Sequence, residues 1–341
     1  MTAGESAPVG VAVITRDRRA SLLRTLDLLA ALPERPPVVV VDNGSRDGTA
    51  ASVAVAHPQV LLLRPGRNLG ACGRNLAAAH LPTRYVAFSD DDSWWQPGAL
   101  SRAAALLDAH PRLGLLAAGT LVGPPEAAHP AHDPLDALLA ASPLGRAGDL
   151  PGPSVLGFLG CACVARREAF LEAGGYHPLL HFGAEETLLA LDLAARGWGV
   201  AYCPEVLARH DPDGDGRERP GRSARVRRNE LLTAWLRRGA REALRATGAE
   251  ARAAVRDPVA RAALAGALAR LPGALCGRVP VPPWLERQLR QLSAPAAPAA
   301  PAAPAAPAVS DLPAVSDLSA APAAPAGPDL PAGAVPEEPS P

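Results

Sequence analysis

The sequence predicts an α/β fold: a mostly parallel sheet flanked by helices, a C-terminal helical appendage, and a disordered Pro/Ala-rich tail. Three observations support it. Short apolar runs alternate with helical patterns over residues 9–120, as in a parallel sheet covered on both faces. Arginines dominate residues 209–252, with helical segments after them. Finally, 13 of the 38 prolines fall in the last 49 residues, many in a Pro-Ala-Ala repeat typical of polyproline II.

The first part of the chain contains four predicted strands, at residues 9–14, 38–41, 60–63 and 85–88. A leucine stripe at 22, 26 and 29 predicts the first helix, and segments 48–56, 72–80 and 98–109 predict three more. Ligands of such sheets bind beyond the carboxyl ends of the strands. The polar residues at those ends are therefore the candidates for function.

Polar side chains follow the first two strands. Thr15 and Arg16 follow the first, and Asp42 and Asn43 follow a run of four valines. Asp42 could accept hydrogen bonds from a nucleobase or a ribose. The small polar residues at 45–49 are typical of turns and helix caps, and we expect that structural role for them.

The third strand is followed by a glycine-containing segment, residues 68–75. It lacks the spacing of a dinucleotide-binding fingerprint. Its glycines would permit close backbone approach, and Arg74 could meet a phosphate at the start of a helix.

Three adjacent carboxylates, Asp90, Asp91 and Asp92, follow the fourth strand, and nothing nearby in sequence neutralises them. Oxygen ligands suit Mg²⁺ or Mn²⁺. In a strand-like geometry Asp90 and Asp92 face the same way, so both could approach one divalent metal. The alternative is a plain acidic turn at the surface.

These segments together resemble a family-2 glycosyltransferase of the GT-A fold. The resemblance rests on residues 13–18, 40–49, 68–75 and 88–92, and continues to about residue 235. In residues 166–170 and 174–176 it includes the family's acceptor-side hairpin and turn. It implies a Rossmann-like sheet and an inverting enzyme that takes a sugar from a nucleotide diphosphate. The residues that it implies for binding the donor nucleotide are Thr15, Arg16, Asp42, Asn43, Arg74, Asp90 and Asp91.

The resemblance also implies a metal site and a catalytic pair. Asp90, Asp92 and His210 would hold the metal, although His210 could equally be an ordinary surface residue. Glu185 and Glu186 match the family's acidic pair, whose second position usually supplies the catalytic base. The alternative is acidic side chains favourably placed at a helix N-terminus. Where the family often has an arginine six residues further on, this chain has Asp192, so that contact is not carried over.

Composition limits the class of protein. The 34 basic residues, all arginine, balance 34 acidic ones, which excludes a globally basic nucleic-acid binder. The five cysteines are odd in number, and without a secretory signal we expect reduced thiols in the cytoplasm. No uncharged apolar run is long enough to cross a membrane.

We expect four regions: a flexible N-terminus at 1–8, the catalytic domain at 9–215, an Arg-rich helical appendage at 216–292, and the tail at 293–341. The tail holds five acids and no arginine, so residues 1–292 carry an excess of five positive charges. Two alternatives stay open for the appendage. It contacts the anionic inner face of the cell membrane, or it is a packed helical region whose basic face is exposed to solvent.

The sequence therefore predicts a metal-assisted inverting glycosyltransferase of cell-envelope polysaccharide biosynthesis, with a glycan or lipid-linked acceptor. Two alternatives stay open. A nucleotidyltransferase also joins a nucleotide to an α/β sheet, but such enzymes normally have a glycine-rich loop after the first strand. A non-catalytic scaffold would recruit partners through the tail.

Overall fold

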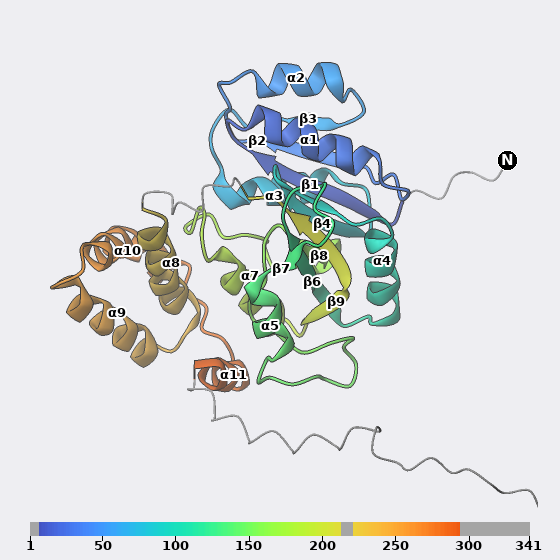
Figure 1. The fold of residues 1–341 in the computed structure, drawn as a ribbon. Coiled ribbons are helices and arrows are strands. Elements are labelled where there is room, and N and C mark those ends of the chain that lie inside the picture. Colours follow the sequence, from blue (N-terminus) through green and yellow to red (C-terminus); the bar gives the residue numbers. More distant parts are fainter. Residues whose placement is uncertain (1–6, 213–220, 294–341) are drawn as a thin grey trace, which may run out of the picture. The chain divides into compact units, whose positions relative to one another are not determined.

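The computed structural model describes residues 7–212 and 221–293. The predicted tail lies outside these residues, except for Ser293. The first half alternates strands and helices closely as predicted (Figure 1). Its elements are β1 (Val9–Thr15), α1 (Arg19–Ala30), β2 (Val38–Asp42), α2 (Thr49–Ala56), β3 (Leu61–Leu63), the short 3₁₀ helix η1 (Gly70–Cys72), α3 (Gly73–His80), β4 (Tyr85–Asp90), β5 (Ser93–Trp95) and α4 (Ala99–Ala109).

The second half completes the sheet and adds a group of helices. Its elements are β6 (Leu113–Val122), β7 (Ala131–His132), α5 (Pro134–Ala140), β8 (Cys163–Arg166), α6 (Arg167–Glu172), α7 (Glu185–Ala195), β9 (Gly199–His210), α8 (Arg222–Arg237), α9 (Ala240–Ala254), α10 (Pro258–Cys276) and α11 (Pro283–Ser293). The prediction of a hairpin at 166–170 was wrong, because Arg166 ends strand β8 and residues 167–170 belong to helix α6.

All described strands form one sheet, in the order β3-β2-β1-β4-β8-β6-β9-β5, with β7 beside β6. Parallel pairing joins β3, β2, β1 and β4, and also β6 and β9, whereas β8, β7 and β5 pair with their neighbours in antiparallel fashion. The sheet is therefore mixed, with four parallel and four antiparallel pairs, and six of its nine described strands run in the same direction, including the predicted parallel group β1 to β4. The carboxyl ends of β1, β2 and β4 meet at one edge.

Apolar side chains cover both faces of this sheet. On one face, Leu22, Leu26 and Leu29 of α1 are at most 1% exposed, as the leucine stripe predicted. On the other, Phe88 of β4 contacts Phe170 of α6, with ring centroids 5.0 Å apart. Fully burying one such side chain contributes about 1.5–3 kcal/mol. The site at the strand ends thus rests on a packed layer.

The C-terminal helices pack on one another and on α7 (Figure 1). Leu232 and Leu236 of α8 share an apolar cluster with Leu188 of α7. A buried ion pair joins the same two helices, since Arg237 Nη2 donates to Asp192 Oδ2 at 3.0 Å. The described residues up to Ser293 form one compact unit. The division at residues 215 and 216 stays a prediction.

One described helix, α10, is long and apolar enough to span a membrane by length and composition alone, and 22% of its most apolar window is buried. The sequence-based expectation of no spanning segment relied on uncharged runs, and Arg261 and Arg270 interrupt this one. All five cysteines are free thiols, as expected.

Candidate functional site

A pocket of about 420 Å³ lies at the carboxyl ends of β1, β2 and β4. Loops after these strands and the segment before α7 form its walls. The residues lining it are Ile14, Thr15, Arg16, Arg18, Asn43, Asn68, Gly70, Asp90, Asp91, Asp92, His181, Phe182 and Arg225. The structure thus brings together six of the predicted site residues, from three separate stretches of sequence.

Arg18 and Thr15 hold the middle carboxylate, Asp91. Thr15 Oγ1 donates to Asp91 Oδ2 at 2.8 Å, and Arg18 Nε donates to Asp91 Oδ1 at 2.5 Å. Arg18 Nη2 also donates to Asp92 Oδ2 at 2.8 Å. Burial raises the pKa of Asp91 to about 7 despite the nearby guanidinium. Asp91 therefore serves to join the loop after β1 to the end of β4.

Two arginines neutralise the aspartate cluster, which corrects the argument made from sequence. Arg18 bridges Asp91 and Asp92, and Arg74 pairs with Asp90. Neither arginine lies near the cluster in sequence, so local inspection could not find them. Unbalanced charge is consequently no evidence for a metal here.

Geometry nevertheless fits a divalent cation beside Asp92. The strand β5 follows Asp92 directly and pairs with β9 so that Ser93 lies opposite His210. This pairing holds His210 Nε2 at 3.6 Å from Asp92 Oδ1, a separation that two ligands about 2.1 Å from one ion can adopt. Burial lowers the pKa of His210, which favours the neutral imidazole that binds metals.

No group of three or more His, Cys, Asp or Glu side chains among the described residues is arranged to hold a metal. Mg²⁺ is usually bound by one or two carboxylates together with substrate phosphates. Asp90, the third predicted ligand, pairs with Arg74 instead. The residues present therefore fit a cation that binds together with a phosphate.

Asp42, the last residue of β2, and Asn43, which follows it, contact the protein itself. Asp42 is 2% exposed and accepts a hydrogen bond from the Ser45 backbone at 2.7 Å. Asn43 Nδ2 donates to the Gly70 carbonyl at 3.1 Å, and its Oδ1 accepts from the Leu69 backbone at 3.0 Å. Asn43 lines the pocket and Asp42 lies behind it. Asn43 thus fixes the loop that carries Gly70.

Gly70 is the position where two loops meet. Its φ is +60°, and a Cβ there would lie 2.2 Å from the His181 carbonyl oxygen. That carbonyl accepts a hydrogen bond from the Ala71 backbone at 2.7 Å. The close approach brings His181 and Phe182 to the pocket, and it is possible only without a side chain.

Arg74 lies beneath the pocket and is 1% exposed. Besides Asp90, it faces Glu185, with Arg74 Nη1 at 3.9 Å from Glu185 Oε1, and its guanidinium lies over the Tyr176 ring at 5.4 Å. The expected phosphate contact stays a prediction. What the contacts show is an arginine that connects the aspartate cluster to the glutamate pair.

Glu185 and Glu186 begin helix α7 after Ala184, whose φ is +58°. Glu185 is 2% exposed, and burial together with Glu186 raises its pKa to about 8. Burial also raises the pKa of Glu186. A raised pKa suits a carboxylate that accepts a proton near neutral pH. The pair adjoins Arg74 rather than lining the pocket.

Glu186 is also packed against Gly160, a residue that sequence reasoning missed. A Cβ at Gly160 would lie 2.9 Å from Glu186 Oε1 and 3.5 Å from the Arg74 guanidinium. Arg18, His181, Phe182 and Arg225 were likewise not predicted as site residues. Arg18 lies in residues 13–18, one of the segments that carry the family resemblance, but a single arginine in a turn carries no distinguishing signal.

Comparison with known proteins identifies the fold and its family. Residues 10–174 match the family model described as glycosyl transferase family 2. The chain carries a family-2 glycosyltransferase domain. Two curated glycosyltransferases from Mycobacterium tuberculosis, both named N-acetylglucosaminyl-diphospho-decaprenol L-rhamnosyltransferase, are 29% identical over 234 residues, which is 59% of this chain and 75% of theirs.

Two solved glycosyltransferase structures share the fold. One is the mannosyltransferase PcManGT of Pyrobaculum calidifontis with GDP-Man and Mn²⁺, at a TM-score of 0.51, 22% identity, and coverage of 81% of this chain and 77% of that one. The other is GalNAc-T7 with UDP, GalNAc and Mn²⁺, at a TM-score of 0.52, 14% identity, and coverage of 69% and 49%. The glycosyltransferase therefore has the GT-A fold predicted from its motifs.

Proposed function

We propose that this glycosyltransferase moves a sugar from a nucleotide-diphospho-sugar to a hydroxyl of a lipid-linked, diphosphate-bearing saccharide. The observation that carries the proposal is the pocket at the ends of β1, β2 and β4, bordered by carboxylates and by arginines. The acceptor class comes from the names of the M. tuberculosis relatives.

The donor nucleotide would occupy the pocket between the loops after β1 and β2. Thr15, Arg16 and Asn43 line it, and Asp42 supports the same loop from behind. The donor diphosphate would lie toward Asp92 and His210. A divalent cation bound there would offset the charge that develops on the departing diphosphate. Mg²⁺ and Mn²⁺ both suit the carboxylate and phosphate oxygens of this site.

Glu186 is the proposed base. A carboxylate with a raised pKa can take the proton of the acceptor hydroxyl as the new bond forms. Attack from the face opposite the departing diphosphate inverts the configuration at the sugar carbon. Glu185 and Arg74 would orient Glu186, since Arg74 connects the glutamate pair to Asp90.

A donor panel tests the substrate class. UDP-, dTDP- and GDP-linked sugars would be screened by thermal shift with and without Mn²⁺. Each stabilising donor would then be incubated with a short-chain N-acetylglucosaminyl diphosphate lipid. Product formation with inverted configuration supports the proposal. Donor hydrolysis without transfer to any diphosphate-linked saccharide would refute the acceptor class.

We also propose a peripheral contact with the cytoplasmic face of an anionic membrane. Several large apolar side chains of the C-terminal helices and their connections are exposed, namely Leu244, Val255, Leu268, Leu275, Val279, Trp284 and Leu292. Arginines surround them in sequence. Salt-sensitive sedimentation with anionic but not neutral liposomes is expected. Equal recovery in the supernatant with both would refute it.

A further inference from the structure

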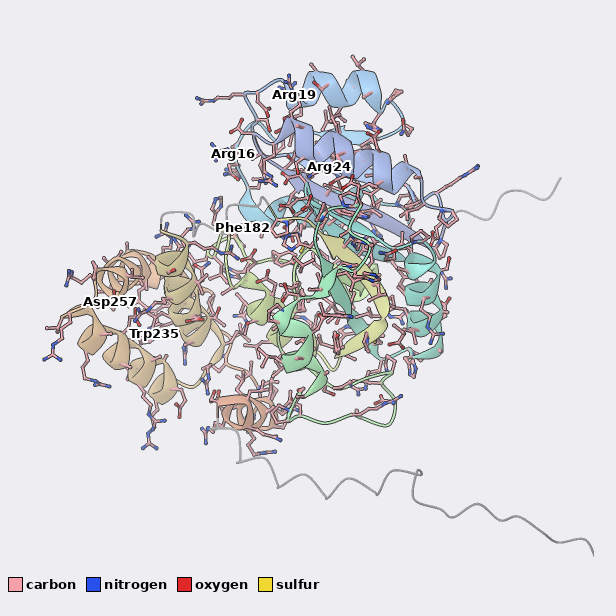
Figure 2. All side chains as sticks on the ribbon, in the orientation of Figure 1. Arg16, Arg19, Arg24, Phe182, Trp235 and Asp257 are labelled. Carbon is pink, nitrogen blue, oxygen red and sulfur yellow. The ribbon has the colours of Figure 1, made fainter. Side chains whose placement is uncertain are left out.

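Besides the aspartate cluster, the pocket is bordered by the C-terminal helix α8. Arg225 of α8 lines the pocket together with Arg16. Arg228, one turn further along α8, and Arg270 of α10 lie close behind. We call Arg225, Arg228 and Arg270 the arginine rim. Figure 2 labels Arg16 and Phe182, which border the same pocket.

The three rim arginines and Arg16 act on His181, a pocket residue. Together with burial, they lower its pKa. Arg228 is half-buried and donates to the Leu180 carbonyl at 3.0 Å. Burial, Arg270 and Arg225 lower the pKa of Arg228 as well. Positive charges are thus close enough to repel one another beside the pocket.

Gly266 allows two members of the rim to meet. A Cβ at Gly266 would lie 3.0 Å from Arg228 Cδ, and Arg270 Nη1 donates to the Gly266 carbonyl at 3.1 Å. Arg225 stands in the first turn of α8, which contains no acidic residue. A helix N-terminus disfavours cations. The helix α8 therefore does not stabilise the positive charge of Arg225.

The rim lacks acidic partners that similar arginines nearby possess. Among the described residues, no ion pair includes Arg225, Arg228 or Arg270, and Arg16 pairs with Asp17 at 3.5 Å on the surface. Other arginines of the same helices pair with acids, namely Arg227, Arg237, Arg238, Arg245 and Arg290. Other arginines of these helices, such as Arg241 and Arg287, also lack an acidic partner in the described part of the chain, but Arg225, Arg228 and Arg270 are the ones whose charge acts on a pocket residue, His181, where an anionic ligand would offset it.

We propose that the arginine rim binds the diphosphate of the acceptor. This rests on the proposed function, in which two diphosphates take part. The donor diphosphate is assigned to the Asp92 side, which leaves the rim for the second one. Guanidinium groups bind phosphate oxygens with paired, charge-assisted hydrogen bonds, and several arginines suit a group that carries two or more negative charges.

The test compares two soluble short-chain acceptors that differ only in charge: an alkyl N-acetylglucosaminyl diphosphate and a neutral alkyl N-acetylglucosaminide. Arg225→Gln and the double variant Arg225→Gln/Arg270→Gln should raise KM for the diphosphate acceptor roughly 10- to 100-fold, the usual effect of losing a hydrogen bond to a charged group. KM for the neutral acceptor and for the donor should change less than about twofold.

Two further variants separate charge from structure. Arg225→Lys should lose less acceptor affinity than Arg225→Gln, because it keeps the charge but not the paired hydrogen bonds. Arg287 is an exposed arginine of α11 that forms no ion pair with a described acid. The variant Arg287→Gln should therefore behave like the unaltered enzyme. Comparable melting temperatures would show that the glutamine variants are folded.

Three results would overturn the inference. A rise in donor KM with an unchanged acceptor KM would assign the rim to the donor diphosphate. Equal losses with both acceptors would make the rim structural. Loss of binding to anionic vesicles, with the soluble diphosphate acceptor unaffected, would assign it to lipid headgroups. If the unaltered enzyme used no diphosphate acceptor at all, the proposed function would fail first, which is a different observation.

Discussion

Substitution of Gly160 by alanine should displace the carboxylate of Glu186. The added Cβ would lie 2.9 Å from Glu186 Oε1, whereas ordinary contacts begin at 3.4 Å, so the carboxylate must move by about 0.5 Å. A misplacement of about 1 Å in a reacting group can cost a factor of 10². We therefore expect kcat to fall roughly tenfold, equivalent to about 1.4 kcal/mol in activation free energy.

The assay is transfer at saturating donor, with donor affinity measured separately by thermal shift. Because the added methyl group meets the glutamate and not the aspartate cluster, donor affinity should be unchanged. Gly157→Ala is the matched control, since a Cβ at Gly157 meets no atom within 4 Å. If Gly160→Ala and Gly157→Ala had the same kcat, the placement of Glu186 as the base would be wrong.

Four other predictions concern single groups. Glu186→Gln should spare donor binding and eliminate transfer, and normal turnover of this variant would contradict the prediction. Asp92→Asn should abolish metal-dependent donor binding, and a retained response of donor binding to metal would contradict that prediction. Burial raises the pKa of both glutamates, that of Glu185 to about 8, and a base must be ionised, so kcat should fall as the pH drops and should begin to fall above the range in which an exposed glutamate titrates; a profile that is flat down to pH 5 would argue against it. Asp192→Ala should destabilise the fold by about 3–5 kcal/mol, because it leaves Arg237 buried without its partner; restoring the loss with Asp192→Leu/Arg237→Met in thermal unfolding would support that cause.

Local sequence patterns were sufficient for the parts of the site that sit at strand ends. The valine run before Asp42 and the apolar run before Asp90 are contiguous signals, so the strands and the edge where their ends meet could be inferred. Asp47 forms the expected turn, since its Oδ1 accepts a hydrogen bond from the Thr49 backbone at 3.1 Å, but the expected side-chain cap is absent, because Gly48 precedes α2.

Partners that are distant in sequence could not be inferred. Arg18 and Asp91 are 73 residues apart, and nothing in either segment indicates the other. The same holds for Asp192, which departs from the family pattern. Asp192 forms an ion pair with Arg237, which lies 45 residues further on in α8. Such pairings depend on how the chain folds back, which no periodicity encodes.

The short strand β5 has a consequence for how the enzyme is made. It ties the end of the aspartate cluster to β9, whose last residue, His210, lies opposite Ser93. Contacts between such distant segments form late, since a long loop must close before they are gained. During synthesis the nucleotide side of the pocket can form early, but Asp92 meets His210 only after β9 has joined the sheet. Partly folded chains would therefore lack the Asp92–His210 pair, and sugar transfer would begin only once the sheet is complete.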